Sequence, residues 1–288
     1  MTYIFRPGIT DLRSDARVYQ PFSGGAFVGA YDAIPDLEHI YEPARRTLSA
    51  YVGDLVLLRR ASDNAELAFT YVEATGDLDV AAIAAWAGGA SYVKTVYDQT
   101  VNADHITQAV AARQPLFSAA AQNGHAGMTF DGTDDDLYSA WTNGGTLAQP
   151  YLYYSIANVD AGSLNDGTRM LFSGATYAAM AGKAATGNPD YWYMFAGANL
   201  SHAGVDANTK IMSLLFNGAS SQLWLNSVSI MSGNAGALAA PALHWGSRAG
   251  TAQFWKGKSE SLIIVDPAHS DAQRGDMQDA MNAYWNTY

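Results

Sequence analysis

The chain has 288 residues, of which 49% are hydrophobic and only 15% are charged, so it can bury a large core and is not expected to be disordered. Its 16 Lys and Arg against 27 Asp and Glu give a net charge of −11, which repels phosphates and excludes DNA and RNA as expected partners. The absence of cysteine excludes disulfides and thiolate metal sites.

The N-terminus lacks the basic start and apolar run of a signal peptide, and no stretch approaches the roughly 18 apolar residues of a membrane span. We therefore expect a protein that is made in the cytoplasm and does not insert into a membrane. Residues 1–36 are rich in Gly, Pro and unevenly spaced aromatics, which predicts an extended arm. The arm either attaches the chain to a partner or packs along its own domain, which we place at residues 37–288.

Several elements can be predicted in chain order. Pro43 followed by good helix formers predicts a short helix over residues 42–51. Two β-rich runs, residues 54–62 and 66–73, flank the turn-like residues 62–64 and predict a hairpin. A helix capped by Asp79 should run through Ile83 and Trp86 and end at Gly88.

The rest of the chain is dominated by strand patterns. Runs at residues 127–132, 135–141, 150–159, 169–174 and 190–197 are each bounded by Gly, Pro, Asn or Asp. Residues 210–231 predict a three-stranded meander with joints at Asn217-Gly218 and Asn226-Ser227, and the Asn-Gly pair favours a primed turn. Residues 254–266 predict a strand pair or one long bent strand. A capping box of Ser270 and Gln273 then opens a last helix, whose apolar stripe is Met277, Ala280, Met281, Tyr284 and Trp285.

Three segments carry a family resemblance. ARRTLSAYVGDLVLLRRASDNAE, GDLDVAAIAAWAGG and SYVKTVYDQTVNADHITQA follow one another in order. Over roughly residues 44–115 the chain resembles the amino-terminal part of the catalytic domain of fungal α-L-arabinofuranosidase B. The remainder resembles a concanavalin A-like or laminin-G-like jelly roll. The resemblance implies a mainly β jelly-roll sandwich with a few short helices and a rim that binds sugars.

The sequence also departs from that family. Its cysteines are absent, and Trp86-Ala87-Gly88 stands where one is expected. A glycosidase needs two carboxyl groups about 5 Å apart for retention or about 6.5–9.5 Å apart for inversion. None of the five glutamates lies in an alternating Glu-x-Asp-x-Glu strand pattern, and the enzyme's acidic pair falls on no matching residues. We therefore assign no catalytic residue and expect a protein that is not an enzyme.

Two groups of residues are candidates for carbohydrate binding. Tyr97, Asp98 and Gln99 form a motif shared with the resembled family and could line a pocket; alternatively they satisfy buried backbone groups. Tyr153, Tyr191, Trp192 and Tyr193 belong to runs with aromatics on both faces of a strand, so some of these rings should face something other than the main core. Sugar stacking and a subunit interface are the two alternatives.

Calcium is the one ion that the pattern suggests. The acidic cluster of Asp131, Asp134, Asp135 and Asp136 could supply oxygen ligands to it, with Asp131, Asp134 and Asp136 as the candidates, although a solvated turn explains the same residues. No other cofactor is expected. The six histidines show no pair at the i, i+4 spacing of a zinc site.

These observations predict a non-enzymatic surface protein of a phage or phage-like particle, such as a gene transfer agent. It would be a virion head spike, a fibre or a tail component that binds cell-surface polysaccharide as a lectin. The arm would join it to other structural proteins, in a homo-oligomer or a multi-copy assembly whose copies add avidity. Two alternatives stay open: a glycoside hydrolase of the arabinofuranosidase type, and a purely structural capsid or tail decoration protein.

Overall fold

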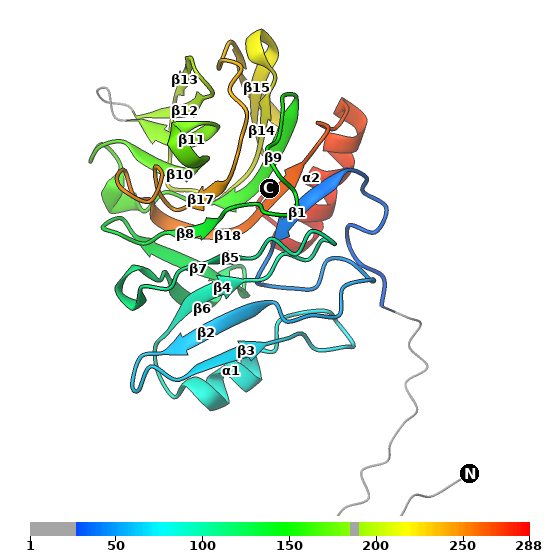
Figure 1. Cartoon of the computed structure of the whole chain (residues 1–288), viewed down its shortest axis with the longest axis vertical. Helices are drawn as coiled ribbons and strands as arrows, with labels where there is room; N and C mark the ends of the chain where they lie inside the picture. Colours follow the sequence, from blue (N-terminus) through cyan, green and yellow to red (C-terminus); the bar gives the residue numbers. More distant parts are fainter. Residues whose placement is uncertain (1–26, 185–189) are drawn as a thin grey trace, which may run out of the picture.

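Antiparallel β-strands make up most of the part of the chain that the structure, a computed structural model, describes: residues 27–184 and 190–288 (Figure 1). The strands in the first half are β1 (Leu37–Tyr41), β2 (Val56–Arg60), β3 (Glu66–Phe69), β4 (Ser91–Val96), β5 (Ile106–Thr107), β6 (Leu116–Gln122), β7 (His125–Asp131) and β8 (Leu137–Ser139). Those in the second half are β9 (Tyr151–Ala157), β10 (Arg169–Ser173), β11 (Met180–Ala184), β12 (Tyr191–Phe195), β13 (Asn199–Ala203), β14 (Lys210–Phe216), β15 (Ser221–Leu225), β16 (Val228–Gly233), β17 (Leu243–Trp245) and β18 (Lys256–Val265). The helices are α1 (Val80–Ala87) and α2 (Asp271–Trp285), and four short 3-10 turns are η1 (Ala111–Arg113), η2 (Ala161–Ser163), η3 (Ala175–Tyr177) and η4 (Gly218–Ser220). The expected mainly β sandwich with a few short helices is confirmed.

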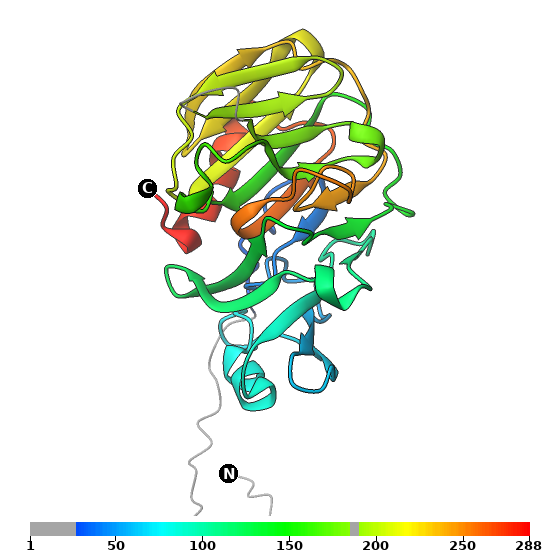
Figure 2. The same ribbon diagram turned by 90° about the vertical axis from the view of Figure 1, so that its left-hand side faces the viewer.

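β9 and β18 form the centre of the sandwich. β9 pairs with β14 on one side and β18 on the other, and all seven of its residues are buried. β18 also pairs with β1 and β7, so it joins the first and second halves of the chain. Helix α2 packs against β14, where Gln278 donates a hydrogen bond of 2.9 Å to Ser213 (Figures 1 and 2). Burial on both sides explains why β9 reads as a continuous apolar run.

Helix α1 and helix α2 confirm the capping predictions. The Asp79 side chain accepts a hydrogen bond from the backbone N–H of Ala82, and Gly88 ends α1 in the left-handed conformation. Ser270 and Gln273 form the expected capping box at the start of α2. The hairpin of β2 and β3 and the meander of β14, β15 and β16 are also confirmed.

Two local predictions are wrong. Residues 42–51 form no helix; Arg45 instead makes a β-bridge with Asp77, and the Arg45 guanidinium forms a buried ion pair with Glu42. These tertiary contacts outweigh the weak helix propensity of the segment. The joint at Asn217 continues into a 3-10 turn and has φ of −150°, so it is no primed turn, whereas Asn226 and Ser227 both have positive φ.

Most of the predicted arm, residues 1–26, lies outside the described residues. Its last part packs on the chain's own domain: Tyr31 is fully buried, donates a hydrogen bond to Glu42 and accepts one from Arg45. Attachment through the arm, the domain boundary at residue 37, the copy number and the location therefore stay predictions. Within residues 27–184 and 190–288, no helix is long and apolar enough to cross a bilayer.

Candidate functional site

A cleft of about 590 Å³ lies on the outer surface of the sheet formed by β2, β4, β6 and β7. Residues such as Leu116 of β6 and Thr129 of β7 face outward into it, whereas their neighbours Phe117, Met128 and Phe130 are buried. The lining side chains come from these strands, from η1 and from the loop after β7. They are Arg59, Ala61, Tyr92, Ala111, Ala112, Gln114, Leu116, Thr129, Asp131 and Asp135.

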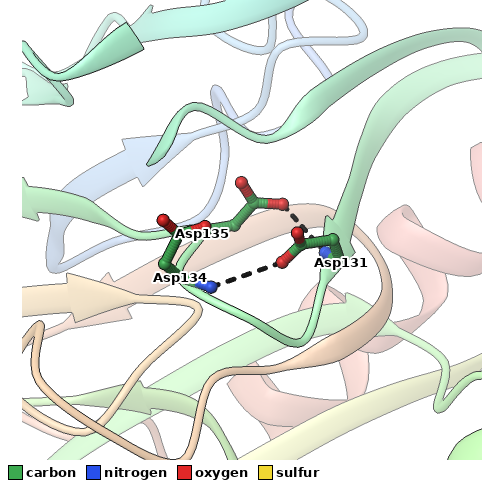
Figure 3. A group of neighbouring side chains, drawn as sticks. All are labelled: Asp131, Asp134 and Asp135. Atoms are coloured by element: carbon green, nitrogen blue, oxygen red, sulfur yellow. Dashed lines mark hydrogen bonds between the residues drawn. The ribbon is translucent and has the colours of Figure 1, made fainter. Parts of the chain in front are cut away.

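Three aspartates meet where β7 ends and the following loop begins (Figure 3). One carboxylate oxygen from each of Asp131, Asp134 and Asp135 lies within 4.8 Å of the others. The loop is held closed locally, because Asp131 accepts hydrogen bonds from the backbone N–H groups of Thr133 at 2.7 Å and Asp134 at 3.4 Å. Asp135 in turn accepts a hydrogen bond of 2.8 Å from the backbone N–H of Asp131.

The environments of these carboxyl groups differ. Asp131 is exposed, whereas Asp135 is only 5% exposed. Burial, together with the negative charges of Asp131 and Asp134, raises the pKa of Asp135 to about 7, although its hydrogen bond from the Asp131 backbone acts in the opposite direction. Asp135 therefore carries a proton below pH 7. The cleft thus contains a protonated carboxyl group next to an exposed one, with an oxygen of Asp135 within 4.8 Å of an oxygen of Asp131.

A second polar network holds the same loop in place. Arg113 donates hydrogen bonds to the backbone carbonyls of Asp134 at 3.1 Å and Gly250 at 2.7 Å. Asp136 is directed into this network, where its carboxylate accepts a hydrogen bond from Ser247 and lies 3.1 Å from Nδ1 of His244. The loop is thus bound to the segment after β17, which fixes the positions of the carboxyl groups in the cleft.

The arrangement of the aspartates agrees only in part with the calcium prediction. Asp131 and Asp134 lie together as predicted, but the third member of their group is Asp135 and not Asp136. Asp136 is held by Ser247 and His244, so its carboxylate has a different role from the one expected. Calcium binding by this loop stays a prediction.

Asp98 and Gln99 are buried and act as connectors between segments. Asp98 accepts a hydrogen bond from the Ile40 backbone and lies 2.9 Å from Nδ1 of His39. The Gln99 side chain accepts a hydrogen bond from the backbone N–H of Thr47 and donates hydrogen bonds to two surrounding backbone carbonyls. Tyr97 is half-buried and packs edge-on against His105, with ring centroids 4.9 Å apart. Tyr97, Asp98 and Gln99 do not line the cleft that contains Asp131 and Asp135.

The predicted aromatic residues divide between the core and the surface. Tyr153 is fully buried and stacks on Phe172, with ring centroids 4.5 Å apart, and Trp192 is also buried. Tyr191 and Tyr193 alternate with Trp192 on β12 and are only half-buried on the opposite face. In the part of the chain that the structure describes, these aromatic residues therefore share no pocket with Tyr97, Asp98 and Gln99. Contact of either group with sugars stays a prediction.

The sequence analysis named Asp135 only as part of an acidic cluster, and it missed the cleft and the distinct environment of this residue. The signal available was the acidic run Asp134-Asp135-Asp136 directly after a strand. Its interpretation as a calcium loop or a solvated turn treated the three carboxylates as equivalent. Only the fold shows that one of them is buried beside an exposed neighbour.

Comparison with known proteins places this chain within a family. Residues 39–187, just over half of the chain, match the family model for the catalytic domain of α-L-arabinofuranosidase B. The chain belongs to this family. The matched region contains most of β1, all of β2 to β11, and the three clustered aspartates Asp131, Asp134 and Asp135. A search of curated proteins found no match.

Solved structures of arabinofuranosidases share the fold of this family member. A GH54 α-L-arabinofuranosidase soaked with a cyclic sulfate inhibitor superimposes with a TM-score of 0.70 at 15% identity, covering 89% of this chain and 64% of that one. An arabinofuranosidase complexed with arabinofuranosyl-α-1,2-xylobiose gives the same TM-score and coverage at 16% identity. The chain thus spans less than two thirds of the length of these solved relatives.

Family membership corrects the main functional expectation. The sequence analysis predicted a non-enzymatic surface protein of a phage-like particle, and this is wrong, because residues 39–187 match the family model for the catalytic domain of α-L-arabinofuranosidase B. The alternative of a glycoside hydrolase of the arabinofuranosidase type is the one that agrees with the comparisons.

Proposed function

We propose that this chain is a glycoside hydrolase that releases α-L-arabinofuranosyl groups from a glycan. The observation that carries the proposal is the match of residues 39–187 to the catalytic domain of α-L-arabinofuranosidase B. The cleft supports it independently, because it combines two carboxyl groups at close range with a raised pKa on one of them. Its volume of about 590 Å³ accommodates a sugar ring and its leaving group.

Asp135 is the candidate general acid. Its carboxyl group is protonated below pH 7 because it is buried, so it can give its proton to the glycosidic oxygen as the bond to the arabinose C1 breaks. A solvated carboxyl would already have lost this proton at neutral pH. The Asp131 backbone N–H then stabilises the carboxylate that remains.

Asp131 is the candidate nucleophile. Its carboxylate attacks C1 of the arabinofuranosyl group and forms a covalent glycosyl ester, while the leaving group departs with the proton of Asp135. The Asp135 carboxylate then takes a proton from water, and this water attacks C1 and releases Asp131. Two displacements at one carbon retain its configuration.

The decisive experiment measures hydrolysis of 4-nitrophenyl α-L-arabinofuranoside by the purified chain. We expect turnover, and a loss of about a hundredfold to ten-thousandfold in Asp131→Asn and Asp135→Asn. Asp276→Asn, at an exposed position on α2, is the matched control and should keep wild-type activity. Proton NMR of the first product should show the retained anomer.

Two outcomes would reject the proposal or its assignment. If the folded protein shows no turnover of this substrate or of arabinofuranosyl oligosaccharides, the chain is not such a hydrolase. If turnover occurs but both variants keep wild-type kcat, the acidic pair lies elsewhere in the molecule.

A further inference from the structure

Lys183 on β11 is a fully buried lysine that does not line the aspartate cleft. Its ammonium group donates hydrogen bonds to the backbone carbonyl of Ser163 at 2.5 Å and to the carboxylates of Asp190 at 2.7 Å and Asp166 at 3.1 Å. An ammonium group carries three protons, so these three acceptors use all of them. The lysine nitrogen is therefore held in one position between two carboxylates.

Asp190, directly before β12, is the buried carboxylate partner of this lysine. Its Oδ2 accepts hydrogen bonds from the Lys183 ammonium and, at 2.9 Å, from the backbone N–H of Asn165. Its Oδ1 is buried and has no hydrogen-bond partner among the residues that the structure describes. A buried ion pair with an unsatisfied oxygen is costly, because the attraction between the charges does not fully offset their loss of hydration. A neutral bond between the two groups removes both charges.

The strand pairing brings the two groups together away from solvent. Lys183 pairs directly with Trp192 across β11 and β12, and Asp190 lies two residues before Trp192. Trp192 is only 1% exposed, so the pair lies beside a buried aromatic ring. Because Oδ2 of Asp190 is bonded to Cγ, the lysine nitrogen lies next to that carbon too. Holding a nucleophile beside an electrophilic carbon replaces a bimolecular encounter by a reaction within one molecule.

Asp166 is a third group that can move protons between them. Its Oδ1 accepts the hydrogen bond from Lys183, and its Oδ2 accepts one of 2.7 Å from Arg169. Burial acts to raise the pKa of Asp166, but the hydrogen bonds from Arg169 and Lys183 lower it overall below its ordinary value. Asp166 is therefore ionised at neutral pH and can take a proton from the lysine.

We propose that Lys183 and Asp190 join in an isopeptide bond between Nζ and Cγ, with Asp166 as the base that transfers the protons. The bond links the end of β11 covalently to the residue before β12. The chain has no cysteine, so disulfides cannot provide such a cross-link. The reaction is independent of the proposed hydrolase function.

The reaction needs no other reagent. Asp166 takes one proton from the ammonium and passes it to the Asp190 carboxylate, which leaves a neutral amine beside a neutral carboxyl group. The amine attacks Cγ, and the N–H of Asn165 stabilises the negative charge that develops on Oδ2. Asp166 then takes a second proton from the nitrogen and gives it to Oδ1, which departs as water. One C–N bond forms and one C–O bond breaks, without oxidation or reduction.

The first test is the mass of the purified full chain, unfolded in acid and measured by electrospray ionisation. We expect a mass about 18 Da below that of the sequence, because one water leaves for each bond formed. Lys183→Arg keeps the positive charge but cannot form this amide, so its mass should equal that of its own sequence. Lys210→Arg is the matched control, because Lys210 forms a partly exposed ion pair with Asp206 at 2.9 Å, and it should keep the mass loss.

The second test locates the bond by peptide mapping. Trypsin does not cleave after a lysine whose amine is part of an amide, so residues 170–210 should appear as one peptide. Tandem fragmentation should place the link between Lys183 and Asp190. A succinimide at Asp166-Gly167 gives the same mass loss but leaves cleavage after Lys183 intact, so the map distinguishes the two products.

Two further variants test the chemistry, with circular dichroism to establish that each is folded. Asp190→Asn should lose about 17 Da instead, because ammonia leaves in place of water. Asp166→Asn retains both partners but not the base, and a positioned base contributes about a hundredfold or more to such a step, so most of this protein should keep its full mass.

Wild-type protein with the full mass of its sequence and complete cleavage after Lys183 would overturn the proposal and leave the contact as an ion pair. A mass loss that persists in Lys183→Arg would overturn it as well. Full cross-linking of Asp166→Asn would reject the role of Asp166. If Lys183→Arg does not fold, the peptide map of the wild type alone decides.

Discussion

Ser261 on β18 donates a hydrogen bond of 3.0 Å to the carboxylate of Glu42, which lies 219 residues earlier in the chain. The same carboxylate accepts hydrogen bonds from Arg45 at 2.6 Å and Tyr31 at 3.0 Å. Glu42 is fully buried, so these donors are what makes its charge tolerable inside the protein. The residues between 27 and 47 are thereby bound to the central strand of the sandwich.

Replacing Arg45 with Met should destabilise the protein by about 3–5 kcal/mol, because it leaves the buried Glu42 carboxylate without its positive partner. The double variant Arg45→Met with Glu42→Gln should recover a large part of that loss. Urea unfolding followed by tryptophan fluorescence measures both. An Arg45→Met protein as stable as the wild type would show that the ion pair adds nothing.

The pH dependence of activity tests the role assigned to Asp135. Its pKa of about 7 predicts that kcat/KM falls as the pH rises through 7, because the acid loses the proton that it must donate. With a substrate whose leaving group needs no protonation, such as 2,4-dinitrophenol, the decline above pH 7 should weaken. Identical profiles for both leaving groups would argue against Asp135 as the acid.

Glu260 provides a test on stability alone. Its carboxyl group is fully buried on β18, and neither oxygen has a hydrogen-bond partner among the residues that the structure describes. Burial raises its pKa to about 8 from an ordinary value of 4.5. The folded state therefore holds this proton more tightly than the unfolded state does, and the resulting stability is present at acidic pH and lost as the pH rises from 4.5 through 8.

Glu260→Gln should therefore flatten the decline in unfolding free energy between pH 5 and pH 8, and should be more stable than the wild type at pH 9 by on the order of a few kcal/mol. Asp135, whose pKa is raised in the same direction, retains its own contribution in that variant. Glu66→Gln, at an exposed position, is the control. Parallel pH curves for wild type and Glu260→Gln would contradict the assignment.

Packing of α2 is tested by Met281→Ala. Met281 is fully buried with Met277 and Trp285 on the face of the helix that lies against the sandwich. Truncation should cost about 2–5 kcal/mol, because the cavity is only partly refilled by its neighbours. Asp279→Ala, exposed on the same helix, should change stability by less than about 0.5 kcal/mol. Chemical unfolding of both variants decides whether α2 is part of the core.

Local signals predicted the elements whose ends are determined by neighbouring residues. The caps at Asp79, Gly88 and Ser270 depend on side-chain to backbone hydrogen bonds within a few positions, so the sequence is sufficient to place them. The segment 42–51 was misassigned for the opposite reason. Its conformation depends on Asp77 and Ser261, partners that are distant in sequence.

The candidate site was predictable only in part. The aspartates were identified as a group, but the difference between Asp131 and Asp135 depends on burial by the surrounding strands. The aromatic residues show the same limit of prediction from sequence. Tyr153 is enclosed because other side chains, such as Phe172 of β10, pack over its ring, and alternation along one strand carries no information on such coverage.

The central position of β18 has a consequence for synthesis on the ribosome. β1, β7 and β9 all pair with this strand, whose residues 256–265 are translated long after theirs. Until it leaves the exit tunnel, the nascent chain exposes unpaired strand edges that can associate with other polypeptides. Efficient production should therefore depend on chaperones that shield these edges. It should also depend on a translation rate that shortens the time during which the edges are exposed.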